Sequence, residues 1–280
     1  MDPTTSAAVY GDITVPLVPF PILVIILLIA LPLSAILGSV VGAARRRQAG
    51  SGQDVDKAVD DTTLGAILAL LGLLLAFTFG NALSLTETRK SDGIAEAAAL
   101  GTVFLRADYL PEPSRTKIQA ALLGYAKTRV LPADGGFKTR DQARQFIDVS
   151  LVAQARLWPL TLEATADPMP APLKTFFASA MNDALDAHLR RMQTLSSPVS
   201  GATQLTLLAT ALTALFLLGD RSGAAGRKPS WRTFVLSGFL FVVMVMIADT
   251  QNAFSGLIRL DDSTLDATIF EMEQALEGRV

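Results

Sequence analysis

The chain has 280 residues, of which 50% are apolar and 18% are charged, and its mean hydropathy is +0.41. Such a composition lies outside the usual range of soluble domains and indicates an integral membrane protein. With 24 basic and 26 acidic residues the net charge is −2, which argues against a nucleic-acid partner. The absence of cysteine excludes disulfides and cysteine-ligated metals.

Four uncharged segments are long enough to cross the hydrocarbon core of a bilayer, which takes about 20 helical residues. The first is preceded by Asp2 and Asp12 and by no Lys or Arg, whereas a secretory signal needs a basic start. We therefore interpret it as a retained anchor. The second segment contains LLGLLLAFTFGNALSLTETRK, a helical pattern that passes from apolar to polar without a turn signal.

The fourth segment is short and ends at Asp249. A carboxylate in this position lies either at the membrane interface or inside the protein beside a cation such as Arg89 or Arg259. We treat these three residues as membrane-boundary charges, and the second alternative would mark an ion or gating site.

Basic residues near the ends of the spans predict the orientation, because short cytoplasmic loops are rich in Lys and Arg. Arg45, Arg46 and Arg47 follow the first span, and Arg227 and Lys228 lie between the third and the fourth. We therefore expect a bacterial inner-membrane protein with both termini and the long central segment outside the cytoplasm. The predicted organisation is tail 1–14, span 15–44, cytoplasmic loop 45–61, span 62–86, extramembrane helical domain 87–198, span 199–219, cytoplasmic loop 220–230, span 231–250 and a helical tail 251–280 that packs on the domain.

Beyond the second span the helical pattern continues, which predicts that this helix leaves the bilayer as one long rod. Further amphipathic patterns, one carrying Ile118, Leu122 and Tyr125, predict an antiparallel helical bundle, and the proline-rich stretch 158–172 is expected to be a connection. No strand pattern competes, so the fold class is all-α. The tail carries an apolar stripe suited to packing on the bundle: Leu265, Ile269, Met272 and Leu276.

No catalytic motif is present, and we expect no enzyme activity, no cofactor and no metal site. The single histidine, His188, lies in an apolar row with Leu185 and Met192, which favours a structural imidazole over a catalytic one.

One face of the second span carries no charge and changes from apolar to aromatic to polar as it leaves the membrane. At 100° per residue its members fall within about 80° of arc. The ordinary interpretation is packing against the other spans, with Gly80 beside it allowing close approach. The functional interpretation is a pore-lining face, which requires a homo-oligomer because four helices are too few to enclose water. The candidate pore-lining residues are Leu73, Phe77, Asn81, Ser84 and Thr88.

Several segments together resemble a bacterial membrane-protein family described as bestrophin-like. They are EAAALGTVFLRADYLPEPSRTKIQAALLGYAKTRV after LLLAFTF, the NDALDAHLRR helix before the third span, and DTQNAFSGLIRLDDSTL after the fourth. The resemblance runs from the second span to the tail. More distantly, LGLLLAFTFGNALSLTETR resembles the pore helix of the bestrophins in ungapped register.

Bestrophins are pentameric anion channels, so the resemblance implies an anion-conducting homo-oligomer with its constriction at Leu73, Phe77 and Asn81. Asn81 departs from the expected aromatic residue, and Lys90 and Ser91 stand where aromatic residues usually follow the arginine. The predicted orientation also differs, since bestrophins keep their helical domain in the cytosol. No calcium-gating site is visible in the sequence.

Two hypotheses follow. The first is an oligomeric ion channel, with the second span lining the pore and a small inorganic anion as the permeant species. The alternative is a non-conducting envelope protein whose helical domain senses or scaffolds a partner. In both, the lipid bilayer is the immediate surrounding of the spans.

Overall fold

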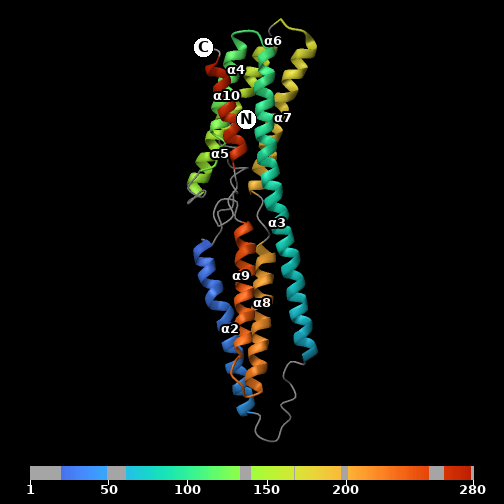
Figure 1. Cartoon of the computed structure of the whole chain (residues 1–280), viewed down its shortest axis with the longest axis vertical. Helices are drawn as coiled ribbons and strands as arrows, with labels where there is room; N and C mark the ends of the chain where they lie inside the picture. Colours follow the sequence, from blue (N-terminus) through green and yellow to red (C-terminus); the bar gives the residue numbers. More distant parts are fainter. Residues whose placement is uncertain are drawn as a thin grey trace. The chain divides into compact units, whose positions relative to one another are not determined.

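The computed structural model describes residues 20–48, 61–132, 140–166, 168–196, 201–251 and 262–278, and these residues form helices and no strand. Figure 1 shows these helices with their labels. The sequence ADGG, which is typical of a turn, and the helix-capping candidate Thr139 both lie outside the described part. The helices are α2 (Phe20–Gln48), α3 (Asp61–Arg106), the short 3-10 helix η2 (Ala107–Tyr109), α4 (Ser114–Lys127), α5 (Arg140–Ala155), α6 (Leu157–Ala166), α7 (Ala171–Ser196), α8 (Gly201–Ala224), α9 (Trp231–Gln251) and α10 (Ser263–Glu277).

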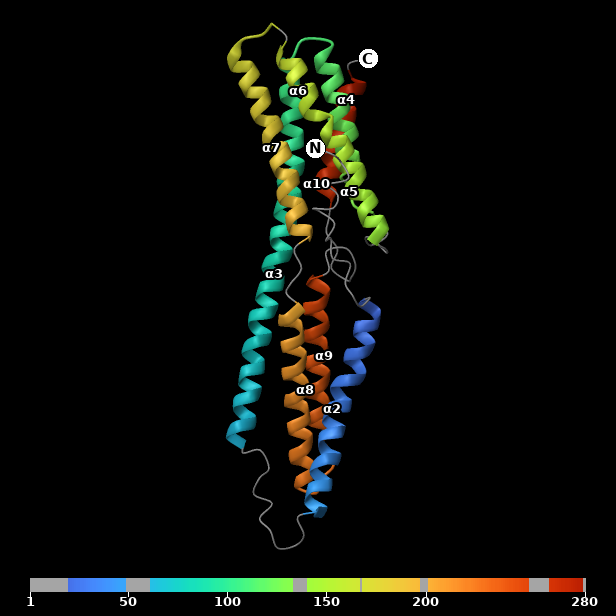
Figure 2. The same cartoon turned by 180° about the vertical axis from the view of Figure 1, so that it is seen from behind.

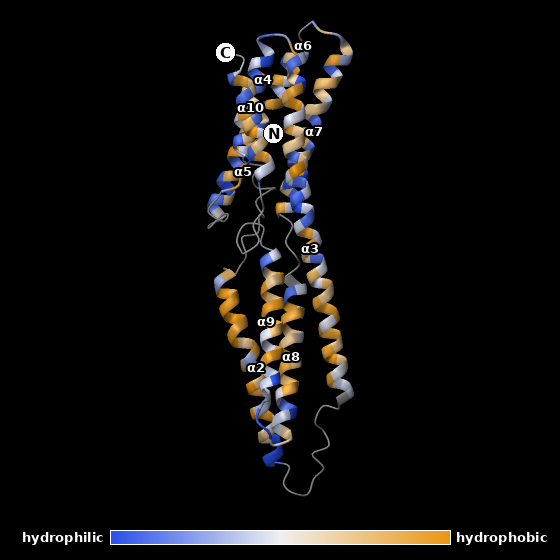
Figure 3. Ribbon diagram, viewed as in Figure 1, coloured by the Kyte–Doolittle hydropathy of each residue, from blue (hydrophilic) through white to orange (hydrophobic). Residues whose placement is uncertain are grey.

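The helices belong to two compact units. The membrane unit contains α2, α8, α9 and α3 up to Ser84, and the bundle unit contains α3 from Leu85 together with η2, α4 to α7 and α10. Among the described residues, four helices are long and apolar enough to cross a membrane: α2, α3, α8 and α9. Figure 3 shows the apolar residues concentrated along them. The prediction of an all-α fold with four spans is confirmed.

Helices α2, α8 and α9 pack around the core of the membrane unit, with Leu31, Ala211 and Leu215 almost fully buried. The contact between α2 and α8 depends on two Gly-x-x-x-Gly pairs, Gly38 with Gly42 and Gly219 with Gly223. A Cβ atom at any of these four positions would overlap a backbone carbonyl of the facing helix. Glycine therefore lets the two backbones touch, which is how membrane helices pack without a hydrophobic driving force.

Helix α3 is unbroken over 46 residues. At 1.5 Å per residue its length is about 69 Å, more than twice the thickness of a hydrocarbon core. The sequence contains no proline between Asp61 and Arg106, and Gly80 and Gly93 lie within the helix without ending it. The predicted continuation of the second span into the extramembrane domain is thus confirmed as a single helix.

The bundle unit has its own apolar core, formed by the part of α3 from Leu85 onward together with α4, α6, α7 and α10. Helix α4 packs against both α6 and α10 (Figure 2). The predicted face of α4 is confirmed, since Ile118, Leu122 and Tyr125 are buried. The tail stripe also packs on the core, with Leu265, Ile269 and Met272 buried and Leu276 partly buried.

The expected proline-rich connection is wrong in its first half, because residues 157–166 form α6. Pro159 is the third residue of this helix. A proline in the first turn removes no hydrogen bond, since the N–H groups there have no partner within the helix. Leu157, Thr161 and Ala164 then give α6 a buried face, and only the stretch after Ala166 acts as a connection.

Candidate functional site

The five predicted pore-lining residues lie on one exposed face of α3. Leu73 is 53% exposed and Phe77 is 70% exposed, while Asn81, Ser84 and Thr88 are also exposed in the single chain. The opposite side of α3 packs into the membrane unit through Leu71, Leu75 and Ala82. In the single chain, one side of α3 is therefore buried in the membrane unit, and the uncharged face is exposed.

Gly80 borders this face, and a Cβ atom built on it would meet nothing within 4 Å. The suggestion that Gly80 permits close packing against another span of the same chain therefore finds no contact in the described residues. The space beside Gly80 and Phe77 is available to a second copy of the chain or to lipid.

The predicted membrane-boundary charges differ in their surroundings. Asp249 on α9 is fully buried within its unit, and Arg89 on α3 is 4% exposed. The Nε atom of Arg89 donates a hydrogen bond to the carbonyl oxygen of Thr194, at 3.1 Å. The pairing of Asp249 with a cation stays a prediction. Arg259 lies outside the described residues.

A further buried carboxylate in the membrane unit, Asp220 on α8, was not singled out by the sequence analysis. Its Oδ1 atom lies 3.1 Å from Nη2 of Arg45, whose side chain is 55% exposed. Asp220 follows Gly219, and its backbone carbonyl faces Gly42. The glycine contact thus buries the carboxylate, and Arg45 at the end of α2 supplies the compensating charge.

The bundle unit contains a buried charge network centred on Glu96 of α3, whose side chain is fully buried. Its Oε1 accepts a hydrogen bond from Nε of Arg129, at 2.8 Å, and its Oε2 accepts one from Nη1 of Arg191, at 2.7 Å. Nη2 of Arg191 also donates to Oδ1 of Asp262, at 2.6 Å. The other carboxylate oxygen of Asp262 accepts from the backbone N–H of Leu131, at 2.8 Å. Two carboxylates and two guanidinium groups therefore balance one another.

Tyr125 and His188 complete the network. The Tyr125 hydroxyl lies 2.7 Å from Nδ1 of His188 and 3.4 Å from Oε1 of Glu96. The Nε2 atom of His188 is buried and has no hydrogen-bond partner among the described residues. The predicted structural role of His188 fits this position, since the ring lies in the core between α3, α4 and α7.

The surroundings of these groups determine their protonation. Burial alone would raise the pKa of Glu96, but Arg129, the hydrogen bond with His188 and Arg191 together hold that pKa well below its usual range. Burial lowers the pKa of His188 and raises that of Tyr125. At neutral pH the network therefore contains a carboxylate at Glu96, a neutral imidazole at His188 and a protonated phenol at Tyr125.

This network holds α3, α4, α7 and the start of α10 together. Pattern analysis missed it because Glu96 and Arg191 are 95 residues apart. One signal was present in the sequence. Glu96 lies next to Ala97 on the face of α3 that continues through Leu100 and Phe104, and all three of these neighbours are buried. A carboxylate on a buried apolar face requires a cationic partner.

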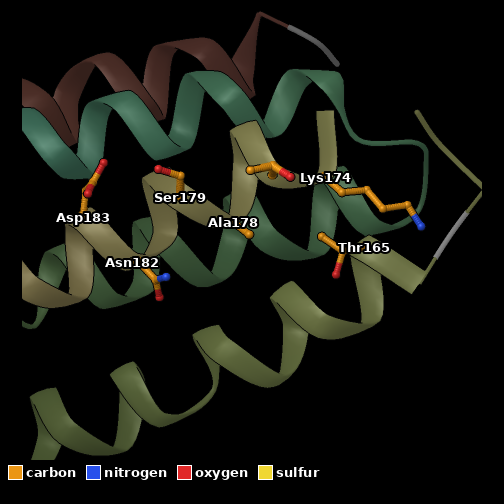
Figure 4. A pocket seen from close by; sticks show the side chains of 7 residues that line it. Thr165, Lys174, Ala178, Ser179, Asn182 and Asp183 are labelled. Atoms are coloured by element: carbon orange, nitrogen blue, oxygen red, sulfur yellow. The ribbon is translucent and has the colours of Figure 1, made fainter. Parts of the chain in front are cut away.

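A shallow depression lies between α6 and α7 (Figure 4), and its lining combines Thr165 and Lys174 with Ser179, Asn182 and Asp183. Lys174 and Asp183 lie toward opposite ends of it. The depression is open to solvent. Within the described residues, no group of three or more His, Asp or Glu side chains is placed to hold a metal ion.

Comparisons with known proteins match this architecture. The model of the Bestrophin-like domain matches residues 30–265. A crystal structure of a bacterial bestrophin homologue from Klebsiella pneumoniae, carrying one substitution, has a TM-score of 0.63 and 13% identity, over 89% of this chain and 98% of that chain. A crystal structure described as a membrane protein has a TM-score of 0.63 and 12% identity, over 90% and 99% of the two chains.

A second variant of the Klebsiella homologue has a TM-score of 0.58 and 14% identity, over 88% of this chain and 98% of that chain. Identities this low show a shared fold. No curated protein matches the chain. The family model covers most of the sequence, including three of the four spans in full and the helical bundle except most of α10. The chain belongs to the Bestrophin-like family.

Proposed function

We propose that the protein is a homo-oligomeric ion channel, with the uncharged face of α3 lining the pore and small inorganic anions as the permeant species. The observation that carries the proposal is the exposure of Leu73, Phe77, Asn81, Ser84 and Thr88 along one side of a membrane-crossing helix. Membership of the Bestrophin-like family and the fold shared with a bacterial bestrophin homologue support it.

A lipid-facing role explains this face less well than a pore does. Leu73 and Phe77 suit hydrocarbon, but Asn81, Ser84 and Thr88 follow in the same line, and an amide side chain is costly in lipid. Around an oligomer axis the same residues would form an apolar constriction that opens into a hydroxyl- and amide-lined vestibule. The change from apolar to polar residues along α3 then corresponds to the change from constriction to vestibule.

The absence of carboxylates on this face supports anion over cation conduction, because rings of Asp or Glu are the usual means of attracting cations. The orientation belongs to the same proposal. The cluster Arg45, Arg46 and Arg47 at the end of α2 supports a cytoplasmic position for that end, and with it an extracytoplasmic bundle unit in a bacterial inner membrane.

The test is conductance of the purified protein in planar bilayers, with its mass in mild detergent measured in parallel. Replacing Phe77 by Ala widens an apolar constriction and should raise single-channel conductance. Leu83 is a matched control, since it is 43% exposed on the same helix but lies about 120° away from the Phe77 line. Leu83→Ala should leave conductance unchanged.

A monomeric protein that carries no current would overturn the channel proposal and favour the alternative, a non-conducting sensor or scaffold. The observation that favours that alternative is the size of the bundle unit, which has its own core and its own buried charge network. Equal effects of Phe77→Ala and Leu83→Ala on conductance would contradict the assignment of the pore face.

A further inference from the structure

The uncharged face of α3 does not end with the predicted pore residues. At 100° per residue, Ser91, Ala95 and Thr102 lie within about 40° of the line through Phe77. Ser91 and Thr102 are exposed, and Ala95 is half-buried. Between Ala66 and Thr102 no residue within that arc carries a charge. The nearest carboxylates on the helix, Glu87 and Asp92, lie on its flanks, about 80° and 60° from the line.

The first charged side chain on this line is Arg106, about 20° from it and the last residue of α3. Its backbone is still helical, with φ −68° and ψ −21°, so the register of the face applies to it. An uncharged line of side chains on α3 thus ends in a cation at the bundle end of the helix.

Among the described residues, Phe176 of α7 holds Arg106 in place. Its guanidinium carbon lies 3.9 Å from the centroid of the Phe176 ring, and its Nη1 donates a hydrogen bond to the Phe176 carbonyl oxygen, at 2.9 Å. Tyr109 packs edge-on against the same ring, with centroids 5.7 Å apart. Phe176 and Tyr109 are 40% and 58% exposed. The cluster is therefore an ordered, solvent-accessible site.

This arginine makes no ion pair within 4.0 Å with any described carboxylate. Other cations of the bundle unit do, including Arg129 with Glu96, Lys117 with Glu163 and Lys127 with Glu273. Stacking on an aromatic ring and bonding to a carbonyl give Arg106 no negative partner among the residues that the structure describes. The stacked arrangement also leaves in-plane N–H groups of the guanidinium available to an anion.

We propose that Arg106 is an anion-binding residue which, repeated around the oligomer, forms a positively charged ring at the bundle end of the conduit and determines its selectivity for small inorganic anions. This inference rests on the proposed channel function. A ring of like charges beside an uncharged wall raises the local concentration of counter-ions. Phe176 and Tyr109 are positioning residues, since they fix the guanidinium without carrying charge.

The experiment is the reversal potential of the purified full-length protein in planar bilayers under a potassium chloride gradient. Arg106→Gln should lower the chloride-to-potassium permeability ratio several-fold at about 0.1 M salt, where the Debye length is about 10 Å. The difference from the wild type should shrink as salt is raised. Arg106→Lys should keep most of the ratio, and Phe176→Leu should give an intermediate value because the cation remains but is no longer held.

Lys90 supplies the matched control, since it is an exposed cation on α3 that lies about 140° from the line. Lys90→Gln should leave the reversal potential unchanged. Wild-type currents with an unaltered ratio in Arg106→Gln would overturn this inference and leave the channel proposal intact. A wild-type protein that conducts nothing would overturn both. Thermal melting of each variant shows whether a variant that carries no current is unfolded. If Arg106→Gln is unfolded, the permeability ratio of Arg106→Lys decides, since this variant retains the charge.

Discussion

Glu96 compensates two buried guanidinium groups of the bundle unit at once. Arg129 is fully buried and Arg191 is 3% exposed. Without the carboxylate, Arg129 would lose its hydrogen-bonded counter-charge, and its contacts with Ser150, Met192 and Phe146 cannot replace a negative charge. Arg191 would keep only its ion pair with Asp262.

Replacing Glu96 by Gln should therefore destabilise the protein by about 3 to 5 kcal/mol, the usual cost of breaking a buried ion pair from one side. The measurement is the unfolding of purified protein in mild detergent, followed by circular dichroism. Glu163→Gln is the control, because its ion pair with Lys117 is half exposed on both sides, and its loss should cost at most about 1 kcal/mol. Similar losses in the two variants would contradict the central role of Glu96.

His188 gives the protein a dependence on pH. Burial holds the pKa of His188 below its usual value of 6.5. Between the two pKa values the imidazole is therefore protonated in the unfolded chain and neutral in the native protein. Stability should therefore be fully present above about 6.5 and fall as the pH is lowered towards the native pKa. The groups facing the ring are Glu96, Tyr125, Arg129 and Arg191.

The measurement is the thermal midpoint of the wild type and of His188→Gln between about pH 7 and pH 5.5, a window above the titration of ordinary carboxylates. The wild type should lose stability across this window, and the variant should lose less. A variant whose profile runs parallel to that of the wild type would show that another group is responsible.

At this scale the sequence predicts apolar burial better than charge burial. The stripe of α10 and the face of α4 were read from spacing, because adjacent turns of one helix bring i and i+4 residues together. The partners of Glu96 come from α4 and α7. The residue spacing within one helix does not show a contact that joins three helices. The placement of His188 was predicted, but its contact with Tyr125 was not.

Among the elements, α2 and α8 form the tightest contact, because glycine occupies both sides of it. Gly38 and Gly42 face Phe216 and Asp220, while Gly219 and Gly223 face Ala35 and Ser39. Each helix thus receives the carbonyl groups of the other in the space where a side chain would lie.

Gly219→Ala should lower stability by about 1 to 3 kcal/mol, since the added methyl group overlaps the Ala35 carbonyl and the helices must separate. Gly238→Ala is the matched control in α9, where a Cβ atom meets nothing within 4 Å. It should be neutral or stabilising by up to about 1 kcal/mol, because alanine is the better helix former. Detergent unfolding curves of both variants make the comparison. A Gly219→Ala protein as stable as the control would show that the contact tolerates separation.

The sequence predicts the extent of α3 correctly and that of α6 incorrectly, for a physical reason. The continuity of α3 followed from a helical pattern without proline, and the structure confirms it. The proline-rich stretch predicts a connection where α6 forms, because a proline such as Pro159 favours a break. Proline ends a helix only where it removes an internal hydrogen bond, and in the first turn there is none to remove.

For the whole molecule, the absence of cysteine makes the proposed orientation directly testable. Ser179 is exposed on α7 of the bundle unit, and Gln48 is exposed at the end of α2. In intact cells, a membrane-impermeant maleimide should label Ser179→Cys, whereas Gln48→Cys should react only after the cells are opened. The reverse pattern would place the bundle unit in the cytoplasm and would reject the orientation inferred from basic residues.

The helix that joins the two units imposes one mechanical condition on the proposed channel. A continuous α-helix turns about its axis as one body, so a torque on Arg106 reaches Phe77 through the hydrogen bonds of a single backbone. A turn of about 100° in one sense would exchange Phe77 for Ala76 on the same line, but it would also move Leu71, Leu75 and Ala82 out of the core of the membrane unit. A change in the width of the proposed conduit by rotation of α3 therefore requires that core to repack.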